Sequence, residues 1–135
     1  MQRLVAWRVA RPCASHAVIA ALGIPAFLMP APAAGFDGRV SWYGPEHGQG
    51  GRRTACGAPF RPDAVLAAHW TLPCGTRVRV TDLRTGRSVV VPVRDRGPRP
   101  DLGRALDLSR GAARRLGMLR RGVIRARIAV LTRPR

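Results

Sequence analysis

Few side chains in this sequence are suited to acid–base chemistry. Its 135 residues include only seven acids and three histidines, and Glu46 is the single glutamate. Asp95, in the run Asp95-Arg96-Gly97-Pro98, is a candidate general acid; the alternative is a turn residue whose carboxylate caps backbone amides. His69 is a candidate partner that orients this acid or donates to a substrate, the alternative being a structural histidine near a strand end. The residue types therefore predict acid–base chemistry centred on one carboxyl group, that of Asp95.

Four other residues are candidates for substrate binding: Asp107, Glu46, Tyr43 and Arg96. Asp107 stands between two leucines at a helix entry, where it forms structural hydrogen bonds or lines a groove. Glu46 lies on a predicted loop after a Trp-Tyr pair, and Arg96 is next to the candidate acid. Binding grooves commonly present aromatic side chains, and sugar rings stack on them. We therefore expect Tyr43 to line such a groove and Trp42 to be buried, core packing being the alternative for each.

The first 34 residues have the pattern of a secretory signal peptide. Arg3, Arg8 and Arg11 precede an apolar run over residues 17–29, and small residues follow it in the stretch PAPAAG. An uncleaved N-terminal anchor is the alternative, although the run is short for a membrane span. Cys13 lies before the apolar run instead of after it, so we expect no lipid attachment. We therefore expect an exported protein of the periplasm or cell envelope that has no stable membrane anchor.

Two cysteines, Cys56 and Cys74, remain after this leader, and each stands directly before a glycine. An even pair in an exported chain favours a disulfide between two turns, which would stabilise the fold by about 3 kcal/mol on the chain-entropy model. A thiol nucleophile and a metal site are the alternatives. No Cys-x-x-Cys spacing occurs, and His47 and His69 stand at no recognised ligand interval. The sequence thus predicts neither a bound metal nor a cofactor.

Most of the charged residues are basic. All 24 cations are arginines, and with the seven acids they give a formal net charge of +17. The arginines are spread along the chain instead of clustering on one helix, and no nucleic-acid recognition motif is present. We therefore expect no nucleic-acid partner; an anionic cell envelope would suit this charge. Because 46% of the residues are hydrophobic, the chain is not a disordered polyelectrolyte.

The secondary-structure signals favour a turn-rich β fold over a helical bundle, since the chain holds 15 glycines and 12 prolines. Ser109 and Gly117 are expected to cap one short helix over residues 111–116. Six short strands are predicted from alternation or apolar runs. They cover residues 38–43, 64–69, 77–83, 88–94, 105–108 and 123–131. The segment 64–69 could equally form a short helix. These elements predict a small β-barrel with crossovers.

Six short motifs stand in a defined order along the chain. They are Ser41-Trp42-Tyr43-Gly44, Thr54-Ala55-Cys56-Gly57, Ala67-Ala68-His69, Leu72-Pro73-Cys74-Gly75-Thr76-Arg77-Val78, Asp95-Arg96-Gly97-Pro98 and Asp107-Leu108-Ser109. Their order and spacing resemble the RlpA-like (rare lipoprotein A) double-psi β-barrel family. The resemblance implies a mainly β chain, with a six-stranded double-psi β-barrel and one short helix over residues 36–131, preceded by the signal peptide. It also implies a lytic transglycosylase that cleaves the MurNAc–GlcNAc bonds of peptidoglycan glycan strands, preferably stripped of stem peptides, and leaves a 1,6-anhydro sugar.

The same resemblance assigns catalytic roles. Asp95 matches the family's aspartate and His69 its histidine, with Leu66 in place of the threonine that opens the family's Thr-Ala-Ala-His motif. In lytic cleavage a general acid protonates the glycosidic oxygen while the sugar's own C6 hydroxyl attacks, so one carboxyl group serves as acid and then as base. Ala58 stands where the family has a glutamate, and Glu46 is a candidate substitute. If that missing acid is indispensable, the chain is instead a non-catalytic, expansin-like module that binds cell-wall glycan.

Overall fold

The computed structural model describes residues 34–45 and 52–134. Glu46 and all of the predicted signal peptide except its last residue, Ala34, lie outside these described residues. The strands, their core and the cysteine pair all belong to one compact unit, residues 31–135. Among the described residues, no helix has the length and apolar composition needed to span a bilayer.

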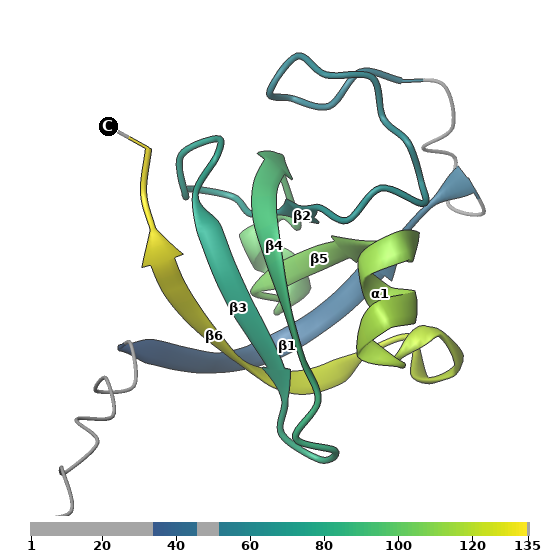
Figure 1. The fold of residues 1–135 in the computed structure, drawn as a ribbon, viewed down its shortest axis with the longest axis vertical. Helices are drawn as coiled ribbons and strands as arrows, with labels where there is room; N and C mark the ends of the chain where they lie inside the picture. The colour runs from purple at the N-terminus through teal and green to yellow at the C-terminus, as the bar shows by residue number, and fades with distance from the viewer. Residues whose placement is uncertain (1–33, 46–51, 135) are drawn as a thin grey trace, which may run out of the picture. The chain divides into compact units, whose positions relative to one another are not determined.

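Six strands close into a single barrel in the spatial order β1-β5-β2-β4-β3-β6 (Figure 1). The pairs β1–β5 and β2–β4 are parallel and the others are antiparallel. The predicted barrel of six strands with one short helix is therefore confirmed. The strand bounds are Gly35–Tyr43 (β1), Ala67–Ala68 (β2), Arg77–Asp82 (β3), Ser88–Asp95 (β4), Leu106–Ser109 (β5) and Ile124–Thr132 (β6).

The β3–β4 hairpin follows directly from its sequence alternation. On β3, arginines 77 and 79 are exposed while Val78 and Val80 are fully buried, as period-two alternation requires. Gly86 takes φ 71° in the connecting turn, a backbone conformation that favours glycine. The fully buried aliphatic side chains include Val40, Val78, Val80, Val91, Val93, Leu106, Leu108, Leu116 and Ile128.

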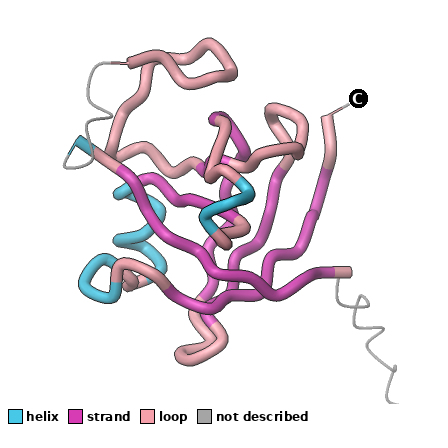
Figure 2. The backbone as a smooth tube through the Cα atoms, turned by 180° about the vertical axis from the view of Figure 1, so that it is seen from behind, coloured by secondary structure: helices cyan, strands magenta, loops and turns pink. Residues whose placement is uncertain are grey.

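Among the described residues the one α-helix is α1 (Arg110–Leu116), and it has the caps that the sequence predicts. The Ser109 hydroxyl accepts a hydrogen bond from the Ala112 amide at 3.3 Å, and Gly117 ends the helix with φ 77°. Buried residues of α1 face β4 and β5. Figure 2 shows α1 on one side of the barrel, with β3 and β6 on the other. Two short 3-10 helices, η2 (Pro100–Leu102) and η3 (Leu119–Arg121), were not among the predicted elements.

The largest departure from the predicted elements is β2. The sequence predicts a strand or short helix over residues 64–69, whereas β2 holds only Ala67 and Ala68. Both residues are buried between β4 and β5, so tertiary pairing decides the element instead of local propensity. Ala68 pairs with Asp95 on β4 and with Asp107 on β5. This short strand therefore lies between two of the predicted site residues, Asp95 on one side and Asp107 on the other.

Candidate active site

Four of the predicted site residues meet at the barrel surface. Tyr43, Asp95, Arg96 and Asp107, together with Ala68, line a small polar hollow of about 90 Å³. They come from the ends of β1 and β4, from β5, and from the turn that follows β4. Because β1, β5, β2 and β4 follow one another in the sheet but lie far apart in the sequence, the fold is what assembles the cluster.

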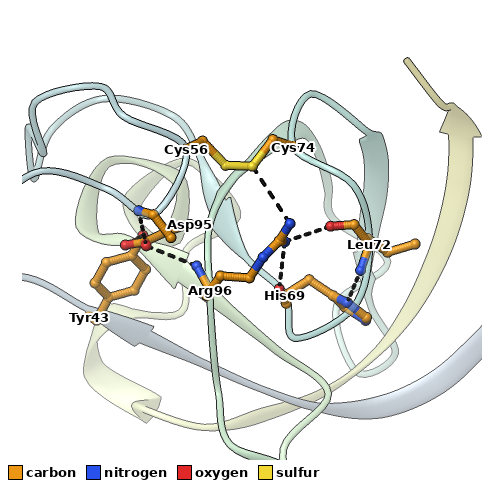
Figure 3. Close-up of a disulfide and its surroundings, with 8 residues drawn as sticks. Tyr43, Cys56, His69, Leu72, Cys74, Asp95 and Arg96 are labelled. Carbon is orange, nitrogen blue, oxygen red and sulfur yellow. Dashed lines mark hydrogen bonds between the residues drawn. A yellow bond between two sulfur atoms is a disulfide. The ribbon is translucent and has the colours of Figure 1, made fainter. Parts of the chain in front are cut away.

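The Asp95 carboxylate is held mainly by backbone amides (Figure 3). Its Oδ1 accepts hydrogen bonds from the amides of Ala55 at 2.8 Å and Arg96 at 2.9 Å. Its Oδ2 accepts one from the Tyr43 hydroxyl at 3.4 Å. The carboxylate therefore caps an amide of its own turn and also fixes a loop 40 residues earlier in the chain. Among the described residues Oδ2 has no partner besides the phenol, which makes Oδ2 the oxygen available to a ligand in the hollow.

Tyr43 reaches this carboxylate as a neutral donor. Its ring stacks on Phe60 at a centroid distance of 5.1 Å, so the hydroxyl is held in place. Burial, followed by the charge of Asp95, raises the pKa of the Tyr43 phenol above its usual value. Trp42, expected to be buried, is half-buried against the core, and its indole N–H donates to the Leu119 carbonyl at 3.3 Å.

Asp107 is a second carboxylate at the same hollow. The Ser41 hydroxyl donates a hydrogen bond to its Oδ1, and an Arg104 guanidinium nitrogen lies 3.7 Å from that oxygen. Arg104 also donates to the Ser41 hydroxyl at 2.7 Å. Asp107 thus forms structural hydrogen bonds and lines the hollow, so both predicted roles describe its position.

The His69 imidazole points away from the Asp95 carboxylate, toward Leu72 (Figure 3). Its Nδ1 accepts hydrogen bonds from the amides of Thr71 at 3.1 Å and Leu72 at 3.0 Å. Burial, followed by the charge of Arg96, lowers the pKa of His69, which favours the neutral ring that this acceptor role requires. His69 reaches Asp95 through the backbone, since its amide donates to the Asp95 carbonyl oxygen at 3.2 Å. A catalytic role for the imidazole stays a prediction.

The Arg96 guanidinium binds the backbone of the segment from His69 to Leu72. One of its nitrogens donates to the carbonyl oxygens of His69 at 3.2 Å and Leu72 at 2.6 Å. The other lies 3.7 Å from the Cys74 sulfur. The charge is therefore directed toward backbone carbonyls and not toward the carboxylate of Asp95, its neighbour in sequence.

The predicted cysteine pair is confirmed as a disulfide. Cys56 and Cys74 are bonded, with their Cα atoms 5.9 Å apart. The bond joins the loop that contains Ala55 to the segment between His69 and Cys74, which the Arg96 guanidinium contacts. Ala58 is exposed, and its carbonyl accepts the Thr54 amide at 2.7 Å in the same loop. The position of the family's glutamate therefore lies on a tight, disulfide-tied turn.

Several residues at the site were not found by sequence reasoning. The Ala55 amide, Ser41 and Phe60 carry no local signal, because their contacts with the site span between 17 and 66 positions in the chain. Arg104 lies only three positions before Asp107, but its contact with Ser41 spans 63 positions. Residues 34–45 and 52–134 contain no group of three His, Cys, Asp or Glu side chains arranged to hold a metal ion.

A closed six-stranded barrel with this mixed pairing and one helix is a double-psi β-barrel. The family model described as "Lytic transglycolase" matches residues 36–128. The chain is 57% identical over 98 residues to a Nostoc protein named "Probable endolytic peptidoglycan transglycosylase RlpA", covering 73% of this chain and 26% of that protein. It is 43% identical over 95 residues to the Campylobacter jejuni "Endolytic peptidoglycan transglycosylase RlpA", covering 70% of this chain and 34% of that protein. The chain belongs to the RlpA-like double-psi β-barrel family.

The chain spans about a quarter to a third of the length of these relatives. Two solved structures share its fold. The Streptomyces papain inhibitor is 29% identical, with a TM-score of 0.59, covering 75% of this chain and 98% of that one. An expansin from Clavibacter michiganensis is 27% identical, with a TM-score of 0.57, covering 76% of this chain and 52% of that one.

Proposed function

We propose that this chain is an exported lytic transglycosylase of the cell envelope. It cleaves the MurNAc–GlcNAc bonds of peptidoglycan strands and leaves 1,6-anhydro ends. The observation that carries the proposal is the Asp95 carboxylate, which is fixed by two amides on Oδ1 and lines a hollow together with Tyr43. The names of the relatives support the same activity. We assign the signal peptide to residues 1–34 and the catalytic domain to residues 36–131.

One carboxyl group is enough for this reaction. Protonated Asp95 gives its proton to the glycosidic oxygen as the bond from that oxygen to C1 of MurNAc breaks. The C6 hydroxyl of the same MurNAc then forms the new bond to C1, and its proton returns to Asp95. No water is consumed, so the single carboxylate ends the cycle in its starting state.

The neighbours of Asp95 have distinct roles in this proposal. Tyr43 and Asp107 contact the sugars in the hollow, and the Tyr43 hydroxyl orients Oδ2. Arg96 and His69 act as positioning residues, because the guanidinium and the imidazole both bind the backbone of the segment that follows β2. Glu46 remains a predicted contact of the substrate.

Mass spectrometry of digested glycan tests the proposal. Naked peptidoglycan strands incubated with residues 31–135 should yield fragments with anhydro ends, and Asp95→Asn should abolish them. Asp101→Asn is the matched control, since Asp101 is an exposed aspartate paired with Arg99 outside the hollow. Anhydro products that persist with Asp95→Asn would remove Asp95 from the mechanism.

The second candidate function is a wall-binding module that does not cleave, and the exposed Ala58 favours it. In that case strands would bind to residues 31–135 and remain intact. Ala58→Glu is then the informative variant, because a gain of cleavage would identify the missing acid as the sole defect. Cleavage by the unmodified chain would exclude this candidate.

A further inference from the structure

The loop over residues 53–58, which we call the Cys56 loop, reaches the candidate acid but makes few hydrogen bonds with the barrel. Among the described residues, only two such bonds join it to the strands. The Ala55 amide donates to the Asp95 Oδ1 at 2.8 Å, and the Cys56 amide donates to the Arg94 carbonyl at 3.3 Å. The remaining hydrogen bonds of the Cys56 loop are internal to it. Its hold on Asp95 therefore depends on whatever else fixes this loop.

The disulfide supplies a covalent attachment for the Cys56 loop (Figure 3). Its other half, Cys74, begins a segment that is paired with β4. Val93 on β4 accepts a hydrogen bond from this segment and donates one to it, each of 2.7 Å. The bond from Cys56 to Cys74 thus ties the Cys56 loop to the same strand end that carries Asp95.

The Ala55 amide affects which oxygen of Asp95 can carry a proton. Oδ1 accepts hydrogen bonds from the amides of Ala55 and Arg96. A carboxylate oxygen has two lone pairs, so these two N–H donors occupy both of them. The proton of the acid is thereby directed to Oδ2, which accepts a hydrogen bond from the Tyr43 hydroxyl. Without the Ala55 amide, Oδ1 could take the proton and the carboxyl group could turn.

We propose that Cys56 and Cys74 are a positioning pair for the acid, because their disulfide holds the Ala55 amide on Oδ1 of Asp95. The role of Asp95 as the acid rests on the proposed function, whereas the path from the disulfide to its carboxylate rests on the contacts themselves. Reduction by a dithiol breaks the S–S bond and leaves two thiols, while the dithiol is oxidised to its own disulfide. Cleavage is then fast in the oxidised protein and slow in the reduced one.

Steady-state kinetics on naked strands separates positioning from stability when each variant is measured well below its melting temperature. Cys56→Ser, Cys74→Ser should lower kcat at least about tenfold, because small displacements of a reacting group are costly. KM should stay within about twofold, since the side chains that contact the sugars are unchanged. Val80→Ala is the control: it opens a cavity in the fully buried core on β3 and should keep kcat. An equal loss of kcat in Val80→Ala would assign the effect to stability and overturn the proposal.

Two substitutions of Ala55 test the path while the disulfide stays intact. Ala55 is the second residue of a β-turn closed by the Gly57 amide and the Thr54 carbonyl at 2.9 Å, a position that favours proline. Ala55→Pro deletes the N–H that bonds Asp95, and it should lower kcat as much as loss of the disulfide does, at a nearly unchanged melting temperature. Ala55→Gly keeps the N–H and should keep kcat. Ala55→Pro combined with both cysteine substitutions should lose no more than either alone, because both act through one hydrogen bond.

Amide hydrogen exchange gives a readout that does not require cleavage. Reduction with dithiothreitol should accelerate exchange of the Ala55 amide at least about tenfold, while the amides of the β3–β4 ladder stay protected. Unchanged exchange at Ala55 would overturn the proposal, and so would full kcat in Ala55→Pro. Failure of the proposed function is a separate outcome. If the unmodified chain releases no anhydro fragments but reduction still accelerates this exchange, the transglycosylase is wrong and the hold of the disulfide on Asp95 stands.

Discussion

Asp82 and Asp95 end the two strands of the β3–β4 hairpin, yet their carboxylates have contrasting surroundings. Asp82 is 1% exposed and accepts hydrogen bonds from the Arg84 amide at 3.0 Å, the Thr85 hydroxyl at 2.9 Å and the Arg121 guanidinium. The hydrogen bond from Arg121 is the main cause that lowers the pKa of Asp82 to about 2. This carboxylate is fixed in its charged form and serves the fold.

Asp95 has no guanidinium on its carboxylate among the described residues, although arginines flank it in the sequence. Two backbone amides hold one oxygen, and the other accepts a hydrogen bond from the phenol of Tyr43, which lines the same hollow as Asp95. The difference separates a structural carboxylate from the carboxylate that we propose as the acid. A cation holds the structural carboxylate, whereas amides position the proposed acid and leave its second oxygen bonded only to the Tyr43 phenol among the described residues.

Replacing each aspartate by alanine should give the largest contrast. Asp82→Ala removes three hydrogen bonds and leaves Arg121 partly buried without its partner, so we expect the free energy of unfolding to fall by about 4 kcal/mol. Asp95→Ala should cost about 1 kcal/mol, because its amide donors lie near solvent. Urea unfolding of both variants measures the difference. Equal losses would contradict the assigned roles.

The disulfide joins two loops at the Asp95 end of the hairpin, and breaking it should destabilise the fold from that end. The Cys56–Cys74 bond closes a segment with a sequence separation of 18, so its loss should cost about 3 kcal/mol and lower the melting temperature by several degrees. Calorimetry of Cys56→Ser, Cys74→Ser measures this. Free thiols in the native protein would refute the pairing.

Low pH should destabilise the fold through the Asp82 carboxylate, at the other end of the hairpin. Because the pKa of Asp82 is about 2 in the fold and 3.8 in the unfolded chain, the unfolded state binds more protons between these values. Its contribution of about 2 kcal/mol is complete above pH 4 and is lost as the pH falls toward 2. Asp82→Asn should show a correspondingly smaller acid-induced loss in urea unfolding. An identical pH dependence in both proteins would mean that Arg121 does not hold this carboxylate.

Arg96→Lys should have an effect on stability as small as that of Asp95→Ala. A lysine ammonium lacks the planar guanidinium that bonds both the His69 and Leu72 carbonyls, so we expect a loss of about 1 kcal/mol. The amide hydrogens of Thr71 and Leu72, which donate to His69, should exchange faster with solvent. Unchanged exchange would show that Arg96 does not hold this segment.

Elements with local signals were predictable from the sequence. The alternation in β3, the Ser109 cap of α1 and the paired cysteines each act over a few residues or through one bond, and the structure confirms them. The closed order of the strands has no local signal. Parallel pairs such as β1–β5 join residues more than 60 positions apart, so no local pattern reports them. The double-psi barrel was predicted from the family resemblance instead.

The site was only partly predictable. Asp95, Tyr43 and Asp107 could be singled out by residue type and motif, and the barrel brings them together. The direction of the His69 imidazole depends on amides within its own turn, and no sequence pattern reports it. Asp82 was missed because its partner Arg121 lies 39 residues away, although an aspartate three residues before Thr85 is a turn signal.

The most direct test of the account is to measure Asp95→Asn by cleavage and by unfolding in the same preparation. The account predicts that anhydro products from naked strands disappear while the melting temperature stays within a few degrees of the unmodified chain. A variant that still cleaves would contradict the role of Asp95 as the acid. A variant that loses as much stability as Asp82→Ala would show that Asp95, like Asp82, serves the fold.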